Sequence, residues 1–108
     1  MMKKFVFGLV GVGLLVSTSM AADGKAIFKS KGCSMCHKET VNSVGPSVKH
    51  IAEVYKGDVD KMVAYLKGEH PAIVDPKKEA MMKRFLGKLK SLHEGDLKAL
   101  AQYLATGK

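Results

Sequence analysis

Both cysteines of this 108-residue chain lie in one five-residue stretch, Cys33-Ser34-Met35-Cys36-His37. This is the C-x-x-C-H pattern of covalent c-type haem attachment. Two thiols at this spacing bond to the two vinyl groups of one porphyrin, and the histidine that follows places an imidazole beneath the iron. The motif therefore predicts a fold built around one haem c, with Cys33 and Cys36 as tethers and His37 as an iron ligand.

Three other uses of paired cysteines compete with haem attachment. A thioredoxin-type redox pair belongs to a βαβ context, and no such pattern is present. A structural zinc site needs a fourth ligand and normally a second Cys or His pair, whereas His50, His70 and His93 are scattered singly. A disulfide that encloses two residues constrains little of the unfolded chain. Haem attachment is the interpretation we adopt.

The N-terminus has the pattern of a secretory signal. Met1 to Lys4 are positively charged, residues 5–16 are a 12-residue apolar run, and Ser19 and Ala21 are small residues at the cleavage positions. We expect residues 1–21 to be a cleaved signal peptide, which predicts a periplasmic domain over residues 22–108. The alternative is an uncleaved membrane anchor, because the uncharged stretch 5–22 is 18 residues long.

The composition of the remaining 87 residues fits an exported haem protein. They contain few aromatic residues and no Trp, so a large apolar cofactor would complete a modest core. Without Lys3 and Lys4 the formal net charge is +6, which favours acidic protein partners. The lysines are spread over every segment, so a merely soluble basic surface is the alternative. Export argues against nucleic acid as a partner.

Apolar residues recur at helical spacing and predict an all-α domain. Asp23 can cap a helix over residues 24–31, with Ala26, Ile27 and Phe28 as buried candidates. A second helix is expected within residues 47–57, where Gly57 ends it, and a third within 58–68, with Asp58 as its cap. A short helix over Met81 and Met82 and a last helix that ends near Gly107 follow. Residues 69–76 are expected to be a loop, although Asp75-Pro76 also resembles a helix start. The last helix begins after either Ser91 or His93.

The second axial ligand decides between an electron carrier and a ligand-binding or catalytic haem. The candidates are His50, Met62, His70, His93 and the pair Met81 and Met82. Met62 lies on a helical apolar stripe, which favours core packing. Met81 and Met82 lie in a lysine-rich segment where apolar residues have little periodic reason to be. We therefore expect one of this pair to be the ligand, with His70 as the main alternative.

With these residues, the chain resembles the class I cytochromes c, in particular small single-haem cytochromes of bacterial periplasms. Gly24 and Phe28 match the Gly-x-x-x-aromatic signature of the first helix of that family, and Leu100 and Tyr103 match its last helix. The resemblance implies that these two helices cross at those residues. It implies a fold of four to five short helices around one covalently bound haem.

The resemblance also implies roles for single residues. Pro46 matches the proline whose carbonyl accepts a hydrogen bond from the proximal imidazole, here that of His37. Residues 80–83 resemble the methionine-ligand segment, and in relatives with a doubled methionine the second is the ligand. This indicates Met82, with Met81 as the second choice. The span from Met82 to Leu92 is longer than in the closest patterns, and His93 stands where a capping serine is usual.

Together these observations predict a monomeric, non-enzymatic carrier of single electrons. Its partners would be larger redox proteins of a respiratory chain, such as a cytochrome complex, a terminal oxidase or a periplasmic reductase. They would dock through acidic patches on exposed lysines near the ligand segments: Lys38, Lys49, Lys77, Lys83 and Lys88. Membrane attachment would require an uncleaved N-terminal segment. The alternative function is a five-coordinate haem that binds a small gas or peroxide.

Overall fold

The structure is a computed structural model that describes residues 23–108, and all regular secondary structure in this range is helical. The expected all-α class is therefore confirmed. The proposed signal peptide, residues 1–21, lies outside the described residues. None of the helices within 23–108 is long and apolar enough to cross a membrane. The α-helices are α2 (Gly24–Ser30), α3 (Val48–Tyr55), α4 (Val59–Leu66), α5 (Glu79–Leu86) and α6 (Glu94–Thr106), and the short 3-10 helices are η2 (Cys33–Met35), η3 (Pro76–Lys78) and η4 (Gly87–Ser91).

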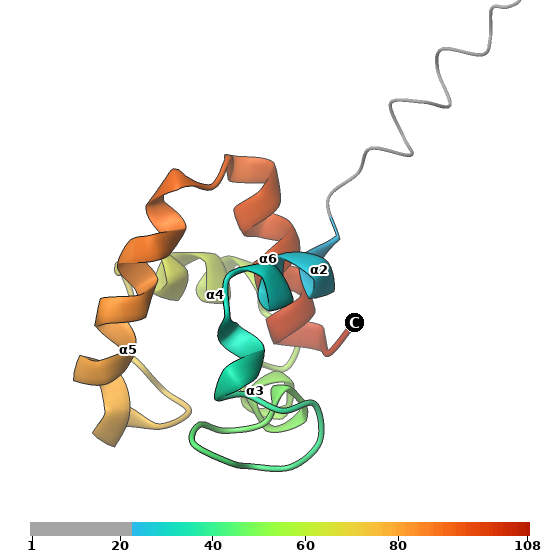
Figure 1. The fold of residues 1–108 in the computed structure, drawn as a ribbon, viewed down its shortest axis with the longest axis vertical. Coiled ribbons are helices and arrows are strands. Elements are labelled where there is room, and N and C mark those ends of the chain that lie inside the picture. The colour runs from blue at the N-terminus through green and yellow to red at the C-terminus, as the bar shows by residue number, and fades with distance from the viewer. Residues whose placement is uncertain (1–22) are drawn as a thin grey trace, which may run out of the picture.

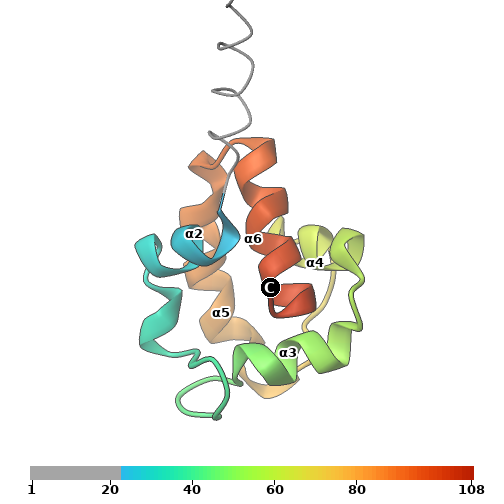
Figure 2. The ribbon, with the colours of Figure 1, turned by 90° about the vertical axis from the view of Figure 1, so that its right-hand side faces the viewer.

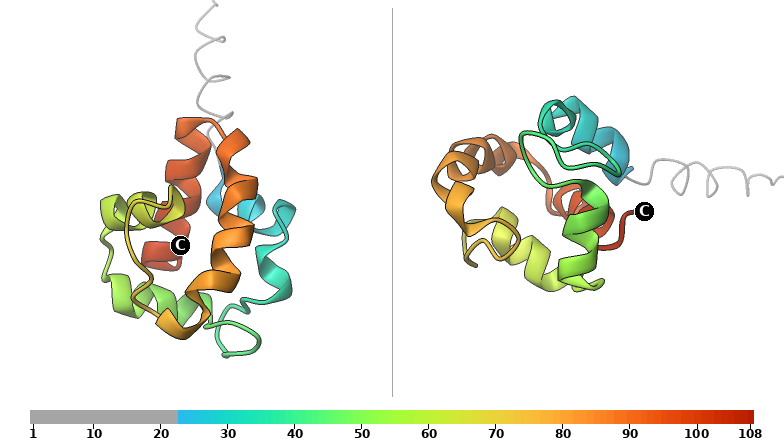
Figure 3. Two further views of the ribbon diagram at one scale, coloured as in Figure 1. Left: turned by 90° about the vertical axis from the view of Figure 1, so that its left-hand side faces the viewer. Right: turned by 90° about the horizontal axis from the view of Figure 1, so that it is seen from below.

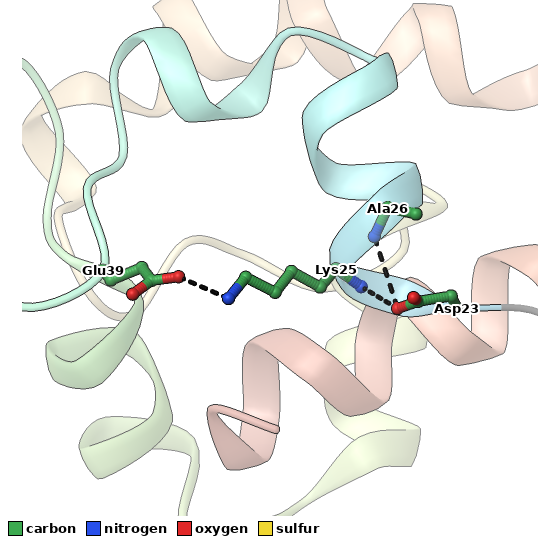
Figure 4. A network of polar contacts seen from close by, with 4 residues as sticks. All are labelled: Asp23, Lys25, Ala26 and Glu39. Carbon is green, nitrogen blue, oxygen red and sulfur yellow. Dashed lines mark hydrogen bonds and ion pairs between the residues drawn. The ribbon is translucent and has the colours of Figure 1, made fainter.

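Side-chain caps begin helices α2, α3 and α4. The Asp23 carboxylate accepts hydrogen bonds from the backbone N–H groups of Lys25 and Ala26, and Lys25 in turn forms an ion pair with Glu39 (Figure 4). Ser47 and Asp58 cap α3 and α4 in the same manner. These caps satisfy backbone donors that have no partner inside the helix.

Three helix boundaries differ from the sequence expectation or resolve an open choice. Helix α6 begins after His93, whose side chain makes no capping hydrogen bond. Pro76 occupies the first turn of η3, but Asp75 supplies no side-chain cap, so only the proline half of that pattern is realised. Helix α3 ends at Tyr55, and its C-cap Lys56 already has a left-handed φ of 52°, one residue before the expected Gly57.

Helix α2 crosses α6 at the expected residues (Figures 1 and 2). The rings of Phe28 and Tyr103 make an edge-to-face contact with centroids 5.3 Å apart. A methyl group on Gly24 would lie 2.1 Å from the Ala99 carbonyl oxygen, so only glycine permits this approach. The prediction that Ala26 is buried is wrong: it is exposed, because it lies two residues and about 200° around the helix from Phe28.

Helix α6 is the centre of the packing, and α2, α3 and α4 all pack against it. Its Leu100 and Ala101 have no exposed surface. Helix α5 differs, because its contacts are mainly with the flanking turns η3 and η4. Seen from below, η2 and its following loop, α3, α4 and α5 surround the interior of the domain (Figure 3).

Candidate haem site

A large pocket opens inside this ring of helices. Its volume is about 1150 Å³ when the open solvent at its mouth is included, and its lining is mostly aliphatic and aromatic. The lining includes Phe28, Tyr55, Tyr65 and Phe85, together with core leucines such as Leu100. Cofactor sites in proteins are concave and mostly apolar, with a few placed polar groups. The pocket therefore suits a large flat apolar group.

The haem motif forms one wall of the pocket. Helix α2 ends at Ser30 with Lys31 as its C-cap, and Gly32, with a left-handed φ of 81°, turns the chain into η2. Glycine takes this conformation without steric cost. As a result Cys33, Cys36 and His37 all line the same pocket, and both thiols are free and half-buried. This placement is what a porphyrin tethered at two points requires.

The orientation of His37 is fixed by a backbone carbonyl. Its Nδ1 lies 2.7 Å from the carbonyl oxygen of Pro46, which is the hydrogen bond that the resemblance implies. Because a carbonyl only accepts, Nδ1 carries the proton and Nε2 keeps its lone pair. A second partner of this kind orients a metal-binding imidazole and raises its basicity. Nε2 is thus the nitrogen available to bind iron.

Gly45 packs directly against the same imidazole. A Cβ at this position would lie 2.6 Å from His37 Cε1, so no larger residue fits without displacing the ring or the loop. Gly45 N–H donates to the Cys36 carbonyl at 2.9 Å, and Ser47 N–H donates to Asn42 Oδ1 at 2.9 Å. These bonds hold the loop over residues 42–47 as a cradle for His37. Neither Gly45 nor Asn42 was predicted to belong to the site, although the glycine directly before Pro46 was a usable sequence signal.

The electrostatics of Cys33 disfavour thiol–disulfide chemistry. Burial raises the pKa of its thiol, against weaker opposing effects of a backbone hydrogen bond and of the Lys88 ammonium. A redox-active cysteine needs the reverse, a lowered pKa that supplies thiolate. Within residues 23–108 no group of three or more His, Cys, Asp or Glu side chains could hold a metal ion, so the zinc interpretation gains no support.

The structure separates the candidates for the second axial ligand. Met62, Met81 and Met82 line the pocket, whereas His50, His70 and His93 do not. His70 lines a separate pocket, with its Nδ1 2.9 Å from the Pro71 carbonyl oxygen. Met62 is 2% exposed and belongs to the core. Met82 is half-buried and packs against the core, while Met81 is 49% exposed.

Two further residues at the pocket mouth were not predicted. Phe85 on α5 lines the pocket one turn after Met81 and Met82. The ammonium group of Lys88 on η4 lies 5.1 Å from the centroid of the Phe85 ring. Lys78 also lines the pocket and donates a hydrogen bond to the Val44 carbonyl. The sequence of a lysine-rich segment does not indicate which of its lysines makes such a contact.

The all-helical fold and the pocket lined by a C-x-x-C-H motif define a class of protein, the small c-type haem proteins. Comparison with known sequences agrees: the family model described as Cytochrome c matches residues 21–108. The chain belongs to the cytochrome c family, and to its class I. Cytochrome c-551 of Stutzerimonas stutzeri is 31% identical over 80 residues, which cover 69% of this chain and 77% of that protein. Haem-based electron transfer is the function of this class.

Proposed function

We propose that residues 22–108, released by cleavage of residues 1–21, form a periplasmic single-electron carrier with one haem c. It would shuttle electrons between larger redox proteins of a respiratory chain. The observation that supports this most is the convergence on one pocket of both cysteines, one histidine and a methionine pair from a separate element, α5. A haem bound there supplies the one-electron iron chemistry, and the chain supplies its ligands and surroundings.

The role we assign to the protein is to keep the ligand geometry unchanged during electron transfer. The His37 ring is held by its hydrogen bond to the Pro46 carbonyl and by close packing against Gly45, so it has little freedom to rotate. The apolar lining excludes water and lowers the local dielectric. A thioether is a soft, neutral ligand that raises the reduction potential relative to a second imidazole. Such a site carries electrons and leaves no position for a substrate.

We propose Met82 as the second ligand and Met81 as the second choice. Neighbouring helical residues point about 100° apart, so only one of the two can face the pocket fully. Met82 is the one that packs against the core, and Met81 keeps about half of its surface exposed. The competing function, a five-coordinate haem that binds a gas or peroxide, needs a vacant position where three methionines line the pocket.

The test is the visible spectrum of the protein matured in a host that attaches haem c. We expect low-spin bands in both oxidation states, a weak sulfur-to-iron band in the ferric state, and no rapid change with carbon monoxide. Met82→Ala should abolish the sulfur-to-iron band, and Met81→Ala is the matched control that should retain it. The reverse result would assign Met81, and a high-spin wild type would support the five-coordinate alternative.

We also propose that acidic partners dock on the face built by residues 76–92. This segment holds six of the sixteen cations of residues 22–108 but one of the ten carboxylates, so the rest of the domain is nearly neutral. Its Lys77, Lys83, Arg84, Lys88 and Lys90 are all exposed. The lysines are spread along the chain as expected, but most of the excess positive charge is concentrated in residues 76–92. Electron-transfer rates with a cytochrome complex, oxidase or reductase should fall as salt rises, and salt-independent rates would refute this docking.

A further inference from the structure

Lys78 makes a contact that no other lysine of the basic segment makes. Its ammonium group donates a hydrogen bond to the backbone carbonyl of Val44, a residue 34 positions earlier in the chain. Its neighbour Lys77 is exposed and makes no hydrogen bond or ion pair within the described residues, whereas Lys78 is half-buried at the pocket. Immobilising a lysine side chain costs conformational entropy, so a contact that persists must offset that cost.

The hydrogen bond joins the two halves of the haem site. On one side, Val44 precedes Gly45 and Pro46, which hold the His37 ring. On the other side, Lys78 lies one helical turn before Met82, at the junction of η3 and α5. A single side chain therefore links the loop that orients one proposed ligand to the segment that carries the other.

Few other polar contacts hold this segment in place. Within residues 23–108, no other side-chain hydrogen bond or ion pair joins residues 76–92 to residues 23–66. Glu79, the first residue of α5, accepts a hydrogen bond from the Ala72 N–H at 3.0 Å, which ties the helix to the loop that precedes it. The remaining ties are apolar, through the buried Leu86 and Leu89 and the half-buried Met82. Helix α5 itself packs mainly on its own flanking turns (Figure 1). Its N-terminal end is thus fastened to the opposite side of the pocket mouth by Lys78.

We propose that Lys78 is a positioning residue that holds α5 against the His37 loop and so keeps the proposed Met82 ligand from leaving the iron. The proposal rests on Met82 ligation only for its spectroscopic readout. We call the hydrogen bond from Lys78 to the Val44 carbonyl the clasp. Loss of the clasp increases local opening of residues 76–86 without a matching loss of global stability, because the core on α6 does not involve Lys78.

The experiment compares Lys78→Met with Lys77→Met in the haem-loaded protein, since both remove one charge from adjacent positions. In Lys78→Met, amide hydrogen exchange over residues 79–86 should accelerate roughly tenfold, the factor expected for losing a hydrogen bond to a charged group. Carbon monoxide binding to the ferrous protein, which requires the methionine to leave, should accelerate by a similar factor. Lys77→Met should match the wild type in amide exchange and in carbon monoxide binding, neither of which involves partner docking. Lys78→Arg, which keeps a charged donor, should restore most of the protection.

The outcomes separate this inference from the proposed function. Equal exchange in the two methionine variants overturns the clasp, as does acceleration that is uniform over α2 and α6. If Met82→Ala leaves the spectrum unchanged, Met82 ligation fails and the carbon monoxide readout fails with it, but amide exchange still tests the clasp. Acceleration confined to residues 76–86 that Lys78→Arg reverses supports the clasp in either case.

Discussion

Replacing Gly24 with alanine tests whether the contact of α2 with α6 holds the domain together. The added methyl carbon would lie 2.1 Å from the Ala99 carbonyl oxygen and 2.9 Å from Tyr103 Cβ, and such contacts are essentially never shorter than 3.0 Å. The two helices must therefore separate by about 0.9 Å at this point, since a backbone oxygen cannot rotate away. The contact between Phe28 and Tyr103, one turn further along, separates as well.

The expected cost follows from these contacts. Overpacking of a closely packed core costs about 1–3 kcal/mol, and loss of an aromatic pair about 0.5–1.5 kcal/mol. Alanine recovers up to about 1 kcal/mol through its higher helix propensity. We expect the free energy of unfolding to fall by about 2 kcal/mol.

The assay is urea denaturation of the haem-loaded protein, followed by far-ultraviolet circular dichroism and by haem absorbance. Gly95→Ala in the first turn of α6 is the matched control, because a methyl group there meets no atom within 4 Å. It should leave the unfolding midpoint unchanged or raise it slightly. If Gly24→Ala unfolds at the same urea concentration as Gly95→Ala, the close approach of these helices is not what stabilises the domain.

Two further predictions concern the pocket. Gly45→Ala should displace the His37 ring or the Pro46 loop, since its methyl carbon would lie 2.6 Å from His37 Cε1. The reduction potential of the haem should therefore shift, and an unchanged potential would contradict the assigned packing. Burial raises the pKa of Tyr55 from its ordinary value near 10 to about 12. Between these values the unfolded chain loses the phenol proton and the folded protein retains it, so the free energy of unfolding should fall as pH rises from about 10 to about 12. Tyr55→Phe should reduce this fall, which urea midpoints measured across that pH range would show.

Much of the fold was predictable because local chemistry specified it. The caps at Asp23 and Asp58 and the apolar stripes of α3, α4 and α6 follow from residue type and helical spacing alone. The motif around Cys33 predicted a haem site because few other sites use those residues at that spacing. The crossing at Gly24 and Tyr103 needed the family resemblance, since nothing local to either residue identifies its partner.

The parts that were not predicted depend on contacts between distant segments. Ala26 was misplaced because an apolar residue in a short helix can lie on either face. The Lys78 contact is invisible in a segment that contains five other cations, because its partner is a backbone carbonyl with no side-chain signature. The role of Gly45 required the position of the His37 ring, which only the folded loop provides.

The packing of α2 on α6 also places the beginning and the end of the domain beside each other. Gly24 contacts Ala99 and Tyr103, and Tyr103 is five residues from the final Lys108. The two ends of the domain therefore lie close together in space. A short linker could join them and give a circular permutant with new termini elsewhere. Truncation has the opposite consequence, because removing α6 would take away the pocket wall that Leu100 and Leu104 provide.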